Sequence, residues 1–278
     1  MTGSNQRSEA KKTHKPRIIS VANQKGGVGK TTTAVNMATA LAAVGRRVLV
    51  VDFDPQGNAS TGFGIDNSKR SMTSYDLIMG DTELSEAIHK SIIPKLDVIP
   101  STIDLSGAEI EMVSMVRREY RLKNCFDKYA MDYDYVIIDC PPSLGLLTLN
   151  ALVASNSILI PLQCEFYALE GLSHLMRTVE LVKQNLNPSL DIQGIVLTMY
   201  DRRNKFTQQI ENDVRQYFGD KVYQSVIPRN IRMSEAPSHG KPAIVYDMKC
   251  PGSLAYIQLA KELLKRERER ANKELTAA

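Results

Sequence analysis

A glycine-rich segment near the start of the chain has the residue types needed to bind phosphate. It reads KGGVGKTT over residues 25–32, and it fits the pattern GxxxxGK[ST] only in part because residue 24 is Gln. Its glycines let backbone amides curl around phosphate oxygens, and a helix beginning there adds its positive end. Lys30 can reach the β- and γ-phosphates of a nucleotide, and the Thr31 hydroxyl can ligate Mg²⁺. The predicted nucleotide-binding residues here are Lys25, Gly26, Gly27, Val28, Gly29, Lys30, Thr31 and Thr32.

Three aspartates could complete such a phosphate site. Asp139 ends the apolar run YVIID, where a carboxylate can face Mg²⁺ through water. Asp52 and Asp54 end a second apolar run in the motif VDFDPQG. Because side chains alternate along a strand, both point to the same face, and only one of them needs to touch the site. Thr31 and Asp139 are therefore candidates to bind Mg²⁺.

Apolar runs alternate with helical patterns along most of the chain, and this predicts the elements that position these residues. Continuous apolar runs separated by helices are typical of a parallel sheet covered on both faces. Ligands bind such sheets at the carboxyl ends of the strands, where the candidate residues lie. The predicted strands are residues 17–22, 47–53, 96–100, 135–139, 157–161, 192–199 and 222–227, and the predicted helices are residues 31–44, 107–129, 145–155, 168–187, 206–218 and 252–272.

No repeat or linker divides this pattern, so we expect a single α/β domain of the P-loop NTPase class. Its sheet should be twisted and mostly parallel, with helices on both faces. The domain is expected to span residues 17–278, after a disordered basic tail over residues 1–16. Residues 54–74, rich in Gly, Asn, Ser and Thr, are predicted to form a surface loop at the ligand edge.

Composition narrows the classes of protein that fit. Of the 278 residues 43% are hydrophobic and 24% are charged, as in an ordinary globular protein. Residues 1–17 carry five basic residues and one acidic residue, which accounts for the whole net charge of +4, so global charge gives no argument for nucleic acid. The four cysteines lie far apart and are read as free thiols. Prolines and asparagines divide the uncharged residues 140–164, so no membrane span is expected there.

The motifs together resemble those of the ParA/MinD group of P-loop ATPases. KGGVGKT is similar to the deviant Walker A motif of that group, in which a lysine opens the loop, and YVIID is similar to a Walker B strand. The resemblance covers residues 17–264 and includes VDFDPQGNAS and DYVIIDCPPSLGLLTLNAL. The block IPRNIRMSEAPSHGKPAIVY at residues 227–246 resembles chromosomal ParA/Soj proteins in particular. The chain is identified on these motifs as a member of the ParA/Soj family.

This resemblance implies roles for particular residues. Lys25 is implied to reach the nucleotide of the facing subunit in an ATP-bound homodimer, where its charge would act as an arginine finger does. The alternative reading of Lys25, a solvated loop cation, stays open. Asp54 is implied to position the attacking water, Asp52 to lie in the surroundings of the metal, and Pro228 and Arg229 to lie near the adenine. The predicted metal-binding residues are therefore Thr31, Asp52 and Asp139. The predicted catalytic residues are Lys25, Lys30 and Asp54, and intrinsic ATP hydrolysis is expected to be slow.

The resemblance also implies a function in the partitioning of chromosomes or plasmids. The ATP-bound dimer is expected to bind duplex DNA of any sequence, and a ParB-like centromere-binding partner is expected to stimulate hydrolysis and release it. The candidate DNA contacts are Arg202, Arg203, Lys205, Arg229 and Arg232. The resemblance favours Arg203 and Arg232, although loop spacing does not separate Arg202 from Arg203 and an ordinary solvated surface would have the same composition. Under this reading the protein is cytoplasmic and associated with the nucleoid.

Two other functions stay open on the sequence. One is a positioning ATPase of the same fold that places a different cargo, and the other is a metabolic ligase similar to dethiobiotin synthetase. The charged end KELLKRERERANKELTAA lacks the apolar face of a MinD-like membrane helix, so no membrane partner is expected. No NKxD guanine motif occurs, which favours ATP over GTP.

Overall fold

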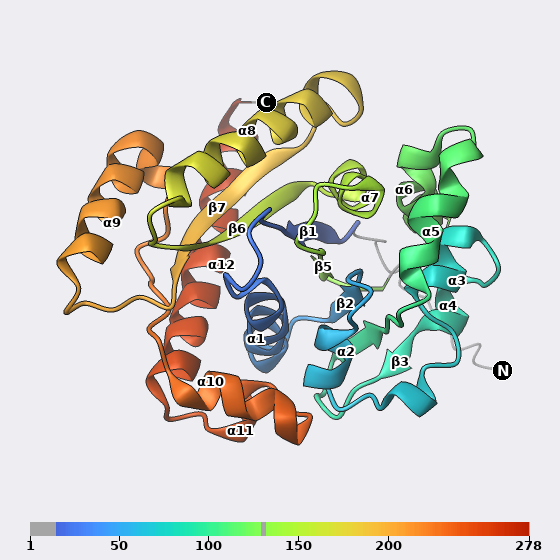
Figure 1. The fold of residues 1–278 in the computed structure, drawn as a ribbon, viewed down its shortest axis with the longest axis horizontal. Coiled ribbons are helices and arrows are strands. Elements are labelled where there is room, and N and C mark those ends of the chain that lie inside the picture. Colours follow the sequence, from blue (N-terminus) through green and yellow to red (C-terminus); the bar gives the residue numbers. More distant parts are fainter. Residues whose placement is uncertain (1–14, 129–131, 278) are drawn as a thin grey trace, which may run out of the picture.

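The centre of the molecule is one β-sheet (Figure 1). Within residues 15–128 and 132–277, which the computed structural model describes, seven strands pair in the order β3-β4-β2-β5-β1-β6-β7. All neighbours are parallel except β3 and β4. The predicted mostly parallel α/β fold is therefore confirmed. The strands are β1 (Arg17–Val21), β2 (Val48–Asp52), β3 (His89–Lys90), β4 (Leu96–Ile99), β5 (Tyr135–Asp139), β6 (Ser157–Gln163) and β7 (Asp191–Thr198).

The central strands are buried on both faces, which explains their continuous apolar sequence. In β2 the side chains of Val48 and Val50 pack into one hydrophobic core, and those of Leu49 and Val51 pack into the other. All four side chains are fully buried. Burial of aliphatic side chains at both faces is the main favourable term that holds such a sheet between its helices.

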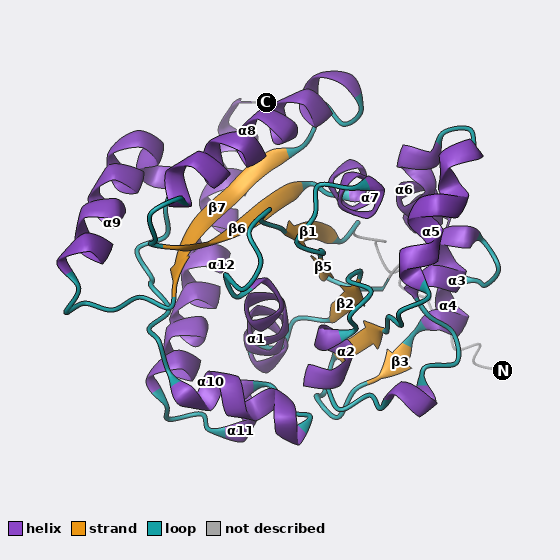
Figure 2. Ribbon diagram, viewed as in Figure 1, coloured by secondary structure: helices purple, strands orange, loops and turns teal. Residues whose placement is uncertain are grey.

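Helices cover both faces of the sheet (Figure 2). On one face α1 (Lys30–Ala43) packs against the C-terminal helix α12 (Pro251–Ala277), and on the other lie α7 (Leu146–Ala154) and α8 (Ala168–Asn185). No helix of the described residues is both long enough and apolar enough to cross a bilayer. The other α-helices are α2 (Asn58–Gly62), α3 (Ser74–Met79), α4 (Leu84–Ala87), α5 (Leu105–Glu111), α6 (Arg121–Lys128), α9 (Lys205–Phe218), α10 (Ile231–Glu235) and α11 (Ala243–Tyr246).

The prediction of one helix over residues 107–129 is wrong. α5 ends at Glu111, and α6 begins only at Arg121, after two 3₁₀ turns. Met115 between them is extended, and Arg117 has a left-handed backbone with φ of 56°. Neither conformation fits inside a right-handed helix. The apolar residues in this stretch therefore mimic helical spacing without forming one continuous helix.

The predicted strand at residues 222–227 is also wrong. The structure has only isolated parallel bridges there. The amides of Gln224 and Ser225 donate to the carboxylate of Glu262 on α12, at 2.9 and 3.0 Å, instead of to a neighbouring strand. A helix side chain thus satisfies the backbone groups that a sheet ladder would have paired.

The segment of residues 54–74 is more ordered than the predicted surface loop. It contains α2 and a 3₁₀ turn at Asn67–Lys69. The antiparallel edge strand β3 was not predicted, because two residues are too few to give a strand pattern. Of the predicted basic tail at residues 1–16, only Lys15 and Pro16 lie within the described residues, so the tail stays a prediction.

Candidate nucleotide-binding site

The glycine-rich loop joins β1 to α1 and provides backbone amides at the start of that helix. Gly27 and Gly29 have φ of 73° and 85°, in the left-handed region that glycine adopts without a steric penalty. Gly29 is the N-cap of α1 and has no side chain to satisfy the first amides of the helix. Val28 lies between them with its side chain buried, so only its backbone can take part in binding. This geometry suits an anion at the helix N-terminus.

Two polar side chains from distant positions hold the loop in place. Asn23 donates from Nδ2 to the carbonyl of Pro161 at 2.7 Å and accepts from the amide of Lys25 at 3.0 Å. Thr198, at the end of β7, donates to the carbonyl of Val28 at 2.8 Å. Neither residue was predicted. Asn23 could have been noticed beside the loop, but Thr198 is 170 residues from its partner and has no local sequence signal.

Lys30 is almost buried at the base of the loop. Its ammonium donates to the carbonyl of Lys25 at 3.0 Å. Burial lowers the pKa of Lys30, and the nearby charges of Asp139 and Asp54 act in the opposite direction. An ammonium with few solvent contacts and two carboxylates close by is well placed to meet the negative charge of a phosphate.

Asp52 and Asp139 are neighbours in the sheet, and burial raises the pKa of both, but they differ in their hydrogen bonds. They pair in register at the ends of β2 and β5, and both are fully buried. Asp52 accepts from the amide and the hydroxyl of Ser60 in α2, at 2.7 and 2.6 Å. Neither oxygen of Asp139 has a hydrogen-bond partner among the described residues. Burial first, and then the charge of Asp52, raise the pKa of the Asp139 carboxyl well above its usual value.

The open carboxylate of Asp139 fits the prediction of a Mg²⁺ site. The Thr31 hydroxyl lies close enough to favour its charged form, although not in hydrogen-bonding geometry. Mg²⁺ keeps several waters and needs only one or two protein groups when phosphates supply the rest, so Thr31 and Asp139 suffice in chemical type. The part of Asp52 stays a prediction, since Ser60 already occupies one of its carboxylate oxygens.

A cavity of about 580 Å³ opens above the loop. Residues of the loop line its wall together with Asp54, whose carboxylate accepts from the amide of Gln56 at 3.0 Å. Pro228 and Arg229, the predicted adenine neighbours, also line the wall. The volume is in the range of sites for small molecules and cofactors. Other lining residues, which the sequence did not indicate, are Asn58, Met199, Asn230, Met233, Ser234 and Tyr256.

The C-terminal helix takes part in this wall. Tyr256 of α12 lines the cavity and is itself almost fully buried. Its hydroxyl forms a hydrogen bond of 2.9 Å with Thr33 of α1, across a separation of 223 residues in the chain. The helix that begins at the phosphate loop is therefore fixed directly to the last helix of the fold.

Lys25 stands apart from the other loop residues. Among the described residues it does not line the cavity, and its ammonium forms an ion pair with Glu165, just after β6. Both side chains remain partly exposed. Unlike Lys30, Lys25 therefore directs its charge to the rim of the site.

Arg203 and Arg232, the predicted DNA contacts, both lie on the surface with acidic partners. Arg203 is 90% exposed and pairs with Asp201 at 3.1 Å. Arg232 of α10 pairs with Glu235 at 2.8 Å and lies 3.7 Å from Asp247. Neither lines the nucleotide cavity. Their part in binding DNA stays a prediction.

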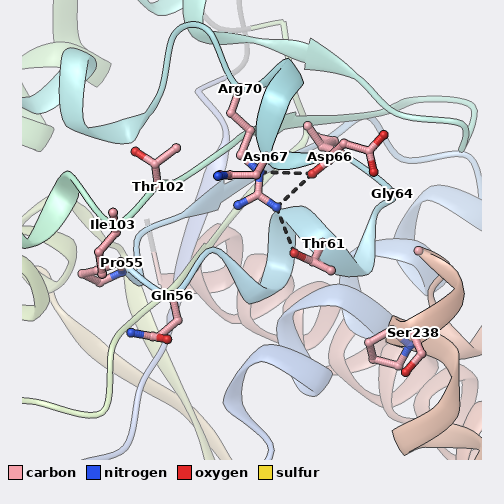
Figure 3. A pocket seen from close by; sticks show the side chains of 13 residues that line it. Pro55, Gln56, Thr61, Gly64, Asp66, Asn67, Arg70, Thr102, Ile103 and Ser238 are labelled. Atoms are coloured by element: carbon pink, nitrogen blue, oxygen red, sulfur yellow. Dashed lines mark hydrogen bonds between the residues drawn. The ribbon is translucent and has the colours of Figure 1, made fainter.

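A second cavity, of about 450 Å³, adjoins the first and is bounded by the segment that follows Asp54 (Figure 3). Arg70 holds that segment together: its guanidinium donates to the carbonyl of Ser101 at 2.8 Å, to the hydroxyl of Thr61 at 2.9 Å and to the carbonyl of Ile65 at 2.9 Å. Arg70 was not predicted, because a single arginine in a polar segment gives no signal of its partners.

A parallel sheet, a glycine-rich loop at the start of a helix and an open aspartate on the neighbouring strand define a P-loop nucleotide-binding protein. The family description AAA domain matches residues 16–192. ParA, the chromosome partitioning protein of Caulobacter vibrioides, is 58% identical over 259 residues, which is 92% of this chain and 97% of that protein. Soj, the sporulation initiation inhibitor protein of Bacillus subtilis, is 55% identical over 89% of this chain and 98% of its own length. The chain belongs to the ParA/Soj family of chromosome-partitioning ATPases.

A solved structure from Mycobacterium smegmatis has the same fold. It is described as cobyrinic acid a,c-diamide synthase with bound ATP analogue and magnesium. It is 38% identical to this chain, with a TM-score of 0.80, and the match covers 91% of this chain and 96% of that one. The expected fold class is thus confirmed by a structure as well as by sequence relatives.

Proposed function

We propose that this protein partitions DNA by binding and hydrolysing ATP with Mg²⁺. ATP binding joins two copies face to face, and the dimer binds duplex DNA without sequence preference. A ParB-like partner stimulates hydrolysis and so releases the dimer. The family membership and the names of the relatives, which are chromosome partitioning proteins, support this function. Under this proposal the protein works in the cytoplasm, on the nucleoid and not on a membrane.

The position of Lys25 is the observation that supports an ATP-bound dimer. A lysine that served its own phosphate site would line the cavity, as Lys30 does. Lys25 instead pairs with Glu165 at the rim, partly open to solvent, from where its charge can serve a nucleotide held by a second copy. In that arrangement each copy completes the catalytic charges of the other.

The remaining residues of the site bind the phosphates and the metal and position the attacking water. Lys30 and the loop amides hold the phosphates, and Thr31 with Asp139 holds the metal. Mg²⁺, when bound, neutralises phosphate charge and polarises the bond to be broken. Asp54 accepts a hydrogen bond from water at the edge of the cavity and so aligns it for attack. No base other than Asp54 lines the cavity among the described residues, which supports slow hydrolysis until a partner binds. The bound ATP analogue and magnesium of the Mycobacterium smegmatis protein support these ligands.

Mixing two inactive variants tests the dimer. Lys25→Ala should bind ATP as a monomer and fail to hydrolyse it, and Asp54→Ala should bind ATP, dimerise and fail to hydrolyse it. A mixed dimer has one site with both Asp54 and a lysine from the facing copy, so the mixture should regain up to about half of the wild-type rate per mixed dimer. Lys265→Ala, an exposed lysine on α12, should behave as wild type. Normal hydrolysis by Lys25→Ala alone would contradict the proposal.

A ligase is the second candidate, because of the likeness to the Mycobacterium smegmatis synthase. The partitioning relatives are more similar, at 55–58% identity against 38%. The two functions differ in what accelerates ATP hydrolysis. Duplex DNA with a ParB-like protein should accelerate a partitioning ATPase, whereas a carboxylic acid substrate and an amide donor should accelerate a ligase.

A further inference from the structure

Three aromatic side chains gather on the surface beside the nucleotide site. Phe166 is 74% exposed, Tyr167 is 64% exposed and Phe206 is 40% exposed. The rings of Phe166 and Tyr167 meet edge to face with centroids 4.9 Å apart, and Phe166 and Phe206 stack with centroids 6.4 Å apart. We call these three residues the aromatic cluster. It joins the segment between β6 and α8 to the first turn of α9.

The aromatic cluster is continuous with the rim at which Lys25 lies. Glu165, the ion-pair partner of Lys25, directly precedes Phe166 in the chain. The cluster and the phosphate loop therefore belong to the same edge of the sheet, the edge where the parallel strands end. A surface that covers the Lys25–Glu165 ion pair therefore lies next to Phe166 in the chain.

Aromatic rings that are exposed to this extent gain stability when another protein surface removes them from water. A Phe or Tyr side chain removes ~150–250 Å² from water when it is fully buried. At the exposures given above, covering the cluster would bury roughly 350 Å² per subunit, a large share of the ~800 Å² that each partner contributes to a stable interface. Aromatic residues are also the type most enriched at the energetic centre of such interfaces.

We infer that the aromatic cluster is a contact surface for a second copy of this chain in the ATP-bound dimer. This inference rests on the proposed function, because it assumes that Lys25 acts on the nucleotide of the facing copy. In a twofold dimer each copy presents the same patch, so the cluster contributes twice. Duplex DNA is a poor occupant for the rings themselves, since its bases are stacked inside the helix and its surface is phosphate, which offers aromatic side chains no apolar face.

The test is dimerisation of the double variant Phe166→Ala with Tyr167→Ala. Its full chain should bind a fluorescent ATP analogue as tightly as wild type, because neither ring lines the nucleotide cavity. With Mg²⁺ and a slowly hydrolysed ATP analogue, sedimentation velocity should show a dimer dissociation constant at least about tenfold weaker. Tyr217→Ala is the matched control, since Tyr217 on α9 is 81% exposed and lies outside the cluster. The variant Phe206→Ala should weaken the dimer by itself if the cluster acts as a unit.

The outcomes separate the inference from the function on which it rests. If wild type dimerises with the analogue and both cluster variants dimerise equally well, the aromatic cluster is not a dimer contact. If they dimerise normally but lose stimulation by DNA or by a ParB-like protein, the cluster belongs to that partner and the inference is wrong. If wild type stays monomeric, the proposed function itself fails. Equal melting temperatures for the variants and Tyr217→Ala exclude a folding defect as the cause.

Discussion

Two aspartates at the ends of neighbouring strands show how strongly the surroundings of a carboxylate affect the stability of its charged form. Asp52 and Asp139 have the same chemistry, the same depth and adjacent positions in the sheet. One is satisfied by the amide and hydroxyl of Ser60, and the other is left without a hydrogen-bond partner among the described residues. Burial and the nearby charge of Asp52 raise the pKa of Asp139 although Lys30 lies close by, so its ionised form costs stability unless a further cation joins it.

Asp139→Asn should therefore have opposite effects on thermal stability with and without nucleotide. Without nucleotide the amide removes the repulsion between the neighbouring carboxylates of Asp139 and Asp52, and the melting temperature should rise by about 4 °C or more. With saturating Mg²⁺ and ATP the variant should lose most of the stabilisation that wild type gains, on the order of 3 kcal/mol at a hundredfold excess over Kd. Thermal unfolding with and without Mg²⁺·ATP measures both effects.

Asp52→Asn is the control for this prediction. Its amide oxygen can accept both hydrogen bonds from Ser60, but these bonds then lose their charged acceptor, and the NH2 group replaces the oxygen that faces the amide of Asp54 at 3.4 Å. It should lower the melting temperature of the empty protein. If the two variants shift the melting temperature in the same direction, the contrast drawn between the two carboxylates is wrong.

The sequence was sufficient to place these aspartates together but not to separate them. Motifs at the ends of apolar runs predict a shared edge, since parallel strands end side by side, and the structure brings Asp52, Asp54 and Asp139 to that edge. The difference between Asp52 and Asp139 depends on Ser60, in a polar segment with no periodic pattern. Thr198 was not predicted for a related reason: its hydrogen bond to Val28 joins residues far apart in the chain, and local sequence spacing does not indicate such contacts.

At the scale of elements, the conformation of the segment that follows β2 depends on hydrogen bonds from Arg70. Three carbonyl or hydroxyl groups from different parts of the chain accept from its guanidinium. Gly57 allows this arrangement, because a Cβ there would come within 2.2 Å of the Arg70 guanidinium. The segment carries Asp54 at one end, so the position of this carboxylate, for which we propose a part in hydrolysis, is linked to the hydrogen bonds of Arg70.

Arg70→Ala should slow hydrolysis without abolishing ATP binding. The loss of several hydrogen bonds to a charged donor loosens the segment, and a misplaced Asp54 lowers kcat, by about tenfold or more. KM should change much less, because Arg70 does not line the nucleotide cavity. Steady-state kinetics measure both constants. Lys69→Ala, which removes the exposed neighbour of Arg70, should leave both unchanged, and equal loss in the two variants would contradict the role of Arg70.

Elements with strong patterns were predicted well, and elements fixed by tertiary contacts were not. The buried strands and the long helices follow from continuous apolar runs and helical spacing. The break between α5 and α6 depends on the backbone conformation of Arg117, and the missing strand at residues 222–227 depends on Glu262 of a helix that comes later in the chain. Neither is visible in a window of neighbouring residues.

At the scale of the whole molecule, DNA binding should be a property of the dimer. Arg232→Glu should weaken binding to duplexes of unrelated sequence and leave ATP binding intact, since Arg232 lies outside the cavity. Two lost phosphate contacts per dimer would flatten the log–log salt dependence by roughly 1.8. Arg203→Glu should act in the same direction. Fluorescence anisotropy across a salt series measures the slope.

Lys265→Glu is the control for charge, because it makes the same change on α12. An equal loss in this control would show that net charge, and not the surface around Arg232, determines DNA binding. Preference for one of the two duplexes would indicate base readout and contradict binding without sequence preference.

The contact between Thr33 and Tyr256 also bears on how the protein is made. The phosphate loop and its helix leave the ribosome early, yet the wall of the nucleotide cavity and the hydrogen bond that fixes α1 come from a helix that begins at residue 251. Contacts of such long sequence separation form late in folding. A growing chain therefore carries a nearly complete phosphate motif long before it has a finished site. Tight nucleotide binding should therefore appear only after α12 has been synthesised.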